Sequence, residues 1–68
     1  MVCKKCVKTK KNIRTAVREE HEAAVDYTKR AKQARHEGNS AASKLFIHIS
    51  KQEIHHKAEL KKQLRRIG

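Results

Sequence analysis

Two amphipathic tracts separated by one cluster of turn residues are the feature that most constrains this chain. The cluster is Gly38-Asn39-Ser40. Gly suits the position just after a helix ends, and Asn or Ser suits the cap of the next helix. On either side, seam positions recur at alternating steps of three and four residues, the spacing of one helix face. The pattern predicts a helical hairpin with helices at about 12–37 and 40–66, preceded by a separate basic segment at 1–11.

Composition supports an all-α fold and an association of chains. The 68 residues include no Pro, no Trp, two Gly, one Phe and one Tyr, which excludes a small β-barrel or sandwich. Only 37% of the residues are hydrophobic, too few to give one hairpin a core of its own. We therefore expect two hairpins (residues 12–68) to pair as a homodimer, or within a higher oligomer, into a four-helix bundle.

Both predicted seams include polar side chains. The first seam is Ile13, Val17, Glu20, Ala24, Tyr27, Ala31 and Ala34. The second seam is Ala42, Phe46, Ile49, Glu53, His56, Leu60 and Ile67. A buried carboxylate is costly unless it is paired, protonated or bound to a metal.

The polar seam residues are expected to meet. Antiparallel pairing about a turn near residue 37.5 places Glu20 opposite position 55, between Glu53 and His56. The i, i+3 spacing of Glu53 and His56 aims both toward the same level. The three side chains therefore predict a metal site, and the alternative is that they lie off the seam and are solvated at the helix edge.

A twofold dimer doubles this set to four glutamates and two histidines. That is the ligand set of carboxylate bundles that bind two iron or two manganese ions. Four carboxylates also balance the charge of two divalent cations. The sequence therefore predicts two Fe, or two Mn, per dimer.

The residues around these three positions form a longer pattern. It consists of the run Glu20-His21-Glu22-Ala23-Ala24-Val25-Asp26-Tyr27, followed by Ala31, Ala34, Glu37-Gly38, Leu45-Phe46 and Glu53-Ile54-His55-His56. In order and spacing, from about Glu20 to Ala58, this pattern resembles the helical half-repeat of the rubrerythrins, a family of the ferritin-like superfamily. The resemblance implies a ferritin-like bundle in which Glu20, Glu53 and His56 ligate iron.

The resemblance also implies an activity: oxidation of Fe(II) by O₂ or peroxide, or reduction of peroxide. It places the aromatic Tyr27 beside the metal centre. From the sequence alone, Tyr27 is as readily explained as core filling, to which a hydrogen bond from its hydroxyl to a ligand carboxylate can be added.

The chain departs from the family pattern in two places. Typical rubrerythrins carry two half-repeats in one chain, whereas this sequence holds one, so dimerisation must supply the other. Many members also have a carboxylate one turn after the first ligand, where this chain has Ala23. That difference weighs against the family's peroxide-linked iron movement.

A single C-x-x-C pair lies near the N-terminus, Cys3-Lys4-Lys5-Cys6. One such pair supplies half of a tetrahedral four-thiolate site, which a symmetry-related pair can complete around Zn or Fe. The alternative is two unliganded thiols. A rubredoxin domain of the rubrerythrin type has two such pairs, so electron delivery is incomplete within this chain.

Strong basic charge favours a different class of function. The net charge is +11, and residues 1–18 hold seven Lys or Arg and no acid. A nonenzymatic basic hairpin dimer that binds nucleic acid through phosphate contacts, or acts as an adaptor, is the alternative to a di-iron protein. A merely solvated basic surface is the simplest explanation of the charge.

The remaining expectations concern location. No stretch approaches 18 apolar residues, and the first eleven residues, MVCKKCVKTKK, contain no apolar signal core. We expect no membrane partner and a cytoplasmic location.

Overall fold

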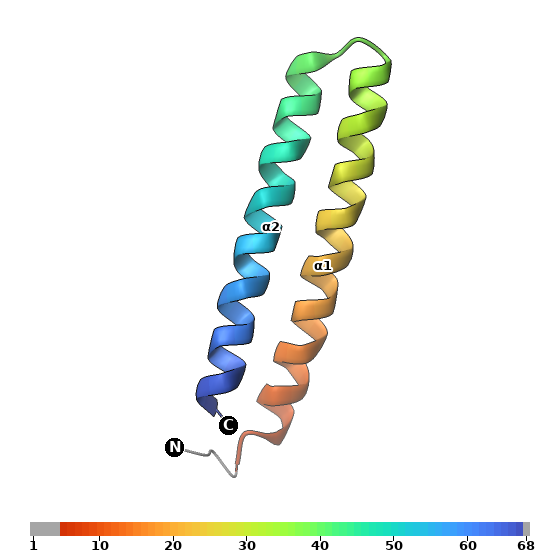
Figure 1. Cartoon of the computed structure of the whole chain (residues 1–68). Coiled ribbons are helices and arrows are strands. Elements are labelled where there is room, and N and C mark those ends of the chain that lie inside the picture. Colours follow the sequence, from red (N-terminus) through yellow and green to blue (C-terminus); the bar gives the residue numbers. More distant parts are fainter. Residues whose placement is uncertain (1–4, 68) are drawn as a thin grey trace.

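The computed structural model describes residues 5–67, which form two antiparallel helices (Figure 1). Helix α1 spans Val7–His36 and helix α2 spans Ser40–Ile67. The connecting turn lies at one end of the hairpin, and the start of α1 and the end of α2 lie together at the other. The predicted all-α hairpin is confirmed. Within the described residues, neither helix is long and apolar enough to cross a membrane.

Helix α1 begins at Val7, whereas the seam predicted a start near residue 12. The segment from Val7 to Lys11 contains no Gly or Pro and three lysines, which are good helix formers. The apolar seam does not reach this first turn and a half, so periodicity alone placed the start too late. Lys8, Lys10 and Lys11 therefore stand on the same helix as the seam.

The turn has the caps that its residues suggest. Gly38 has a φ of 83°. Its N–H donates to the carbonyl of Arg35 at 3.0 Å, and the N–H of Asn39 donates to that of Ala34 at 2.8 Å. These two bonds form a Schellman motif, which favours Gly at this position because L side chains are strained there. Asn39 then caps α2, because its Oδ1 accepts the N–H of Ala42 at 3.0 Å.

Small side chains fill the contact between the helices. The buried residues of the described chain are three alanines and two serines: Ala24, Ala31, Ala34, Ser43 and Ser50. None of its large side chains is fully buried. The hairpin is a single layer with principal extents of 52 × 14 × 9 Å. The two helices therefore approach closely but leave their larger apolar side chains only partly covered.

The contact face of α2 is rotated from the predicted seam. Every predicted seam residue of α1 is buried or half-buried, as expected. In α2, however, Ser43 and Ser50 are buried, and His56 is exposed in the hairpin. His56 was expected in the buried seam, and its exposure in the hairpin has a physical reason. The spacing of apolar residues does not distinguish the face of α2 that contacts α1 from a face that contacts another chain.

A hydroxyl network fixes the register of the two helices. Thr28 Oγ1 and Ser50 Oγ lie 2.9 and 3.0 Å from the carbonyl oxygen of Ala24, and 3.0 Å from each other. Two hydroxyl groups and one carbonyl oxygen therefore form a partly buried triangle. Because Ser50 reaches across to the α1 backbone, this network locks the level at which α2 lies against α1.

Candidate metal centre

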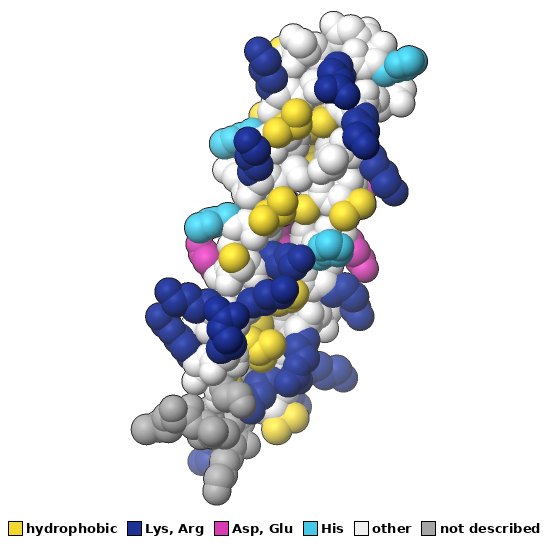
Figure 2. Space-filling model, in the orientation of Figure 1, with side chains coloured by type: hydrophobic (Ala, Val, Ile, Leu, Met, Phe, Trp, Pro, Cys, Tyr) yellow, Lys and Arg dark blue, Asp and Glu magenta, His cyan; other side chains and the backbone are white. Residues whose placement is uncertain are grey.

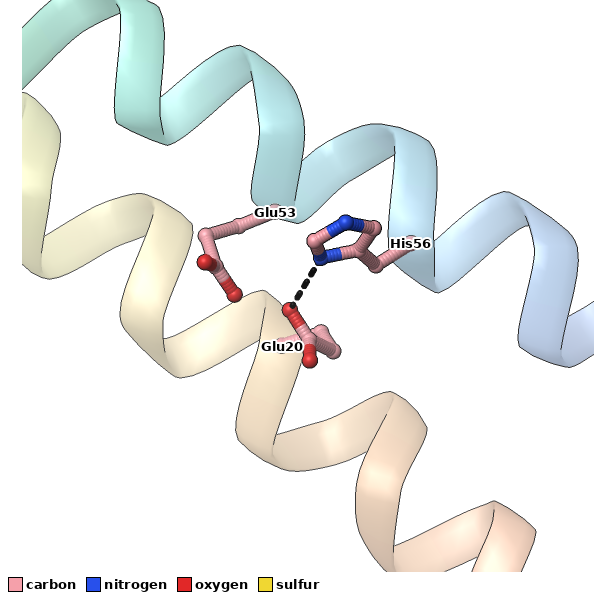
Figure 3. A group of neighbouring side chains, drawn as sticks. All are labelled: Glu20, Glu53 and His56. Carbon is pink, nitrogen blue, oxygen red and sulfur yellow. Dashed lines mark ion pairs between the residues drawn. The ribbon is translucent and has the colours of Figure 1, made fainter.

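Three side chains of types that commonly ligate metals converge one turn beyond the hydroxyl network. Glu20 extends from α1, and Glu53 and His56 extend from α2 toward it (Figure 3). One ligand atom from each of the three lies within 4.8 Å of the other two. We call these three residues the carboxylate–imidazole cluster. The three residues meet in the structure, as the sequence predicted.

The hydroxyl network explains this placement. Glu20 lies one turn before Ala24 on α1, and Glu53 lies one turn after Ser50 on α2. In an antiparallel hairpin these two steps lead in the same direction. Glu53 therefore lies directly opposite Glu20, and the next turn of α2 brings His56 to the edge of the same level.

One carboxylate oxygen of the cluster lacks a partner. Glu20 Oε2 is buried and accepts no hydrogen bond from the described residues. His56 Nδ1 lies 3.6 Å from this oxygen, which is too long for a hydrogen bond. A buried carboxylate oxygen without a donor is destabilising. This orphaned oxygen, aimed at two other ligand groups, fits a site for a metal ion.

Electrostatics in the cluster also favour an added cation. The pKa of Glu53 is raised above its ordinary value, first by a hydrogen bond with the Glu20 carboxyl. Desolvation and the negative charge of Glu20 raise the pKa further, while His56 lowers it. Two carboxylates this close cannot both ionise without cost. A divalent cation would relieve that repulsion and would compete with protonation of Glu53.

Metal affinity should therefore fall as the pH is lowered, and at a higher pH than for an ordinary glutamate pair, because the pKa of Glu53 is raised. The metal-free protein should show the opposite trend. A raised folded-state pKa means that stability is gained when Glu53 is protonated and lost as the pH rises through that pKa. Mn(II) calorimetry and thermal denaturation in chelator measure the two trends. Glu53→Gln is the control, and it should remove the dependence of the metal-free protein's stability on pH. If stability depended on pH in this variant as it does in the parent, the interpretation would be contradicted.

The donor types suit iron or manganese. Carboxylate oxygens and one imidazole nitrogen match the ligands that these ions take in proteins. One hairpin offers only three such side chains, too few to complete the shells of two ions. His56 is 52% exposed and Glu20 is 25% exposed, so the cluster lies open on one side of the hairpin. The three side chains of one hairpin therefore leave coordination positions unfilled on the open side of the cluster.

Tyr27 lies apart from the cluster. Its ring packs against that of Phe46 with centroids 6.1 Å apart, and the Arg30 guanidinium carbon lies 5.1 Å from its centroid. Tyr27 is two turns from Glu20 on α1, and no hydrogen bond joins its hydroxyl to the cluster within the described residues. In the hairpin it is a packing residue, and its role beside a metal stays a prediction.

The other histidines near the cluster have partners of their own. His55 Nε2 lies 2.6 Å from Glu59 Oε1, on the exposed side of α2. His21 Nδ1 lies 3.0 Å from Lys57 Nζ, also exposed. Both residues flank the cluster without entering it.

The predicted thiolate site falls largely outside the described residues. Cys3 is not among them, and Cys6 occupies the position just before α1. Binding of Zn or Fe by Cys3 and Cys6 stays a prediction.

Sequence reasoning missed the residues that position the cluster. Ser43 and Ser50 are seven residues apart, two helical turns, and both are 6% exposed. A recognisable signal was present: small residues at this spacing opposite Ala24 and Ala31 favour close approach of two helices. They were overlooked because larger residues beside them gave the stronger apolar pattern.

Comparison with known proteins agrees with this geometry. The family model described as Rubrerythrin matches residues 4–68. The chain belongs to the rubrerythrin family. Searches of curated proteins and of solved structures gave no match. At the level of the family, this rubrerythrin is a ferritin-like di-iron protein, a class that binds iron and typically oligomerises.

Proposed function

We propose that two hairpins of this rubrerythrin bind two iron ions between them and oxidise Fe(II) with O₂ or peroxide. The observation that carries the proposal is the carboxylate–imidazole cluster, with its orphaned Glu20 oxygen on the open side of the hairpin. A second copy would bring the total to four carboxylates and two imidazoles. That set matches the ligands of di-iron carboxylate bundles and balances the charge of two divalent ions.

The position of the cluster along the hairpin supports an antiparallel pairing of the two copies. Glu53 lies near the middle of α2, which spans Ser40–Ile67. A twofold axis perpendicular to the helices and passing through the cluster therefore overlaps the hairpins along nearly their full length. A long overlap between the two hairpins would cover the apolar side chains that one hairpin leaves partly exposed.

Charge favours the same arrangement. We define the turn half as residues 19–56 and the terminal half as residues 5–18 and 57–67. The turn half has six basic and six acidic residues, and the terminal half has eleven basic residues and one acidic residue. Antiparallel pairing sets each terminal half beside a turn half of zero net charge, whereas parallel pairing would place two strongly basic halves together.

The residues of the cluster then have distinct roles. Glu20 and Glu53 would hold the metal through their carboxylates, and His56 would supply the nitrogen ligand from each copy. Any proton shared by the two carboxyls would leave when metal binds, because the raised pKa of Glu53 favours its protonated form. Bound iron would supply the electrons that reduce O₂ or peroxide. Reduction of one peroxide molecule to two waters takes two protons and one electron from each of two Fe(II) ions. With peroxide as oxidant, iron oxidation and peroxide reduction are one reaction.

Anaerobic titration with Fe(II) tests the proposal. We expect an endpoint of two Fe(II) per dimer and, after addition of O₂ or peroxide, the near-ultraviolet absorbance of carboxylate-bound Fe(III). Glu22→Gln, at an exposed glutamate beside the cluster, is the matched control and should leave the endpoint unchanged. An endpoint of zero, or iron that binds but is not oxidised faster than in buffer, would refute the proposal.

A further inference from the structure

The antiparallel hairpin gathers basic residues from both ends of the sequence at one end of the molecule. The start of α1 and the last turns of α2 lie together there (Figure 1). The terminal half carries a net charge of +10, whereas the turn half is neutral. Figure 2 shows Lys and Arg side chains over both helices in this region. The charge of the molecule is therefore concentrated at one end.

These basic groups are available to a partner. Nine of the eleven are exposed and two, Lys10 and Lys57, are half-buried. No ion pair within the described residues engages any of them, and Glu59, the one acid of the terminal half, is paired with His55. At 100° per residue, the basic positions cover about half the circumference of each helix. They form a broad basic surface on two packed helices.

We infer that the terminal half binds the phosphate backbone of double-stranded nucleic acid without regard to base sequence. The helical stretch from Val7 to Arg18 is about 18 Å long at 1.5 Å per residue. A duplex carries one charge per roughly 1.7 Å, so about ten phosphates lie along that length. This number is close to the net charge of the terminal half.

The chemistry of the surface selects nucleic acid over a membrane. An interfacial helix needs an apolar face beside its basic residues. Of the exposed large hydrophobic residues that the structure describes, only Val7 belongs to the terminal half, and the other four, Val25, Leu45, Ile47 and Ile54, lie in the turn half. The surface offers charge without an apolar face, which is the requirement of phosphate contacts.

The same surface excludes base reading. The only aromatic side chains, Tyr27 and Phe46, belong to the turn half, so no ring can stack on bases at the terminal half. Affinity would come from phosphate contacts and counterion release alone. Binding is separate from the carboxylate–imidazole cluster, and it does not depend on iron.

Fluorescence anisotropy with a labelled 20-base-pair DNA duplex tests the inference on the whole protein. The test variant replaces Lys8, Lys11, Lys61 and Lys62 with Gln, and the matched control replaces Lys29, Lys32, Lys44 and Lys51 with Gln. All eight lysines are exposed, and both variants lose the same charge. We expect the test variant to bind about tenfold or more weakly and to lower the slope of log affinity against log salt by up to about 3.6. The control should stay within about twofold of the parent at 0.1 M salt.

Each remaining outcome overturns the inference. Equal loss in both variants would show that net charge, and not the terminal half, determines binding. No binding at 50 mM salt, or tighter binding to phosphatidylglycerol vesicles or to polyglutamate than to the duplex, would refute a nucleic-acid surface. Strong dependence on duplex sequence would also refute it. Circular dichroism checks the fold, and the pairs Lys8/Lys11 and Lys61/Lys62 can be replaced separately if the fourfold variant unfolds.

Discussion

Replacing Glu53 with Leu should abolish metal binding and make the metal-free protein more stable at pH 7. Glu53 lies directly opposite Glu20, and its pKa is raised by that carboxyl and by desolvation. Removing one of two facing carboxylates removes their repulsion, and a leucine adds apolar contact where the second hairpin is proposed to pack. Exchanging buried charges for apolar groups is often stabilising by about 1 kcal/mol or more. Iron titration and thermal denaturation in chelator measure the two effects.

The two effects must occur together for the cluster to be what we propose. Glu22→Leu is the control, because Glu22 is exposed on α1 two residues from Glu20. It should leave both the metal endpoint and the stability nearly unchanged. If Glu53→Leu behaved like this control in stability, the side chain would be solvated and not part of a shared core. If it retained the two-ion endpoint, Glu53 would not be a ligand.

The local signals in the sequence proved reliable. Gly38 and Asn39 occupy the cap positions that their chemistry favours, because cap preferences depend on one or two neighbouring backbone groups. The register followed from the turn, since an antiparallel hairpin with a three-residue connection leaves little freedom. Together these signals were sufficient to bring Glu20 opposite Glu53, 33 positions away in the sequence.

What the sequence could not separate were the faces of α2. Ser50 is buried against the backbone of Ala24, while His56, predicted in the same seam as Glu53, is exposed in the hairpin. The helical spacing of apolar residues indicates which positions are buried, but it does not indicate which neighbouring helix buries them. His56 belongs to the edge between two faces, where it can serve both its own hairpin and a second one. The position of His56 at this edge therefore explains why its burial was mispredicted and also why we propose that a second hairpin packs there.

A single hairpin should not be stable alone. Ile49→Asp should dissociate the proposed dimer into poorly folded monomers. Ile49 lies one heptad before His56 on α2, so the two share the stripe that borders the open side of the cluster. No large apolar side chain of the described hairpin is fully buried, which leaves apolar surface that a second copy would cover. Placing a carboxylate in that interface should weaken dimerisation by about 100-fold or more, since a buried unpaired charge costs several kcal/mol. Sedimentation and dilution-dependent circular dichroism measure the change.

Ile47→Asp provides the matched control, because it introduces the same charge on a different side of the same helix. Two positions apart at 100° per residue, Ile47 and Ile49 point in nearly opposite directions around α2. Ile47 is 42% exposed and lines a groove with Thr28 and Lys32, away from the cluster. Pairing through the cluster face predicts that Ile47→Asp keeps the dimer and the two-iron endpoint, whereas Ile49→Asp loses both. A compact, stable parent monomer at micromolar concentration would contradict obligate pairing. Equal effects of the two substitutions would contradict pairing through the cluster face. Only an interface on the open side of Glu20 and His56 can complete the metal site.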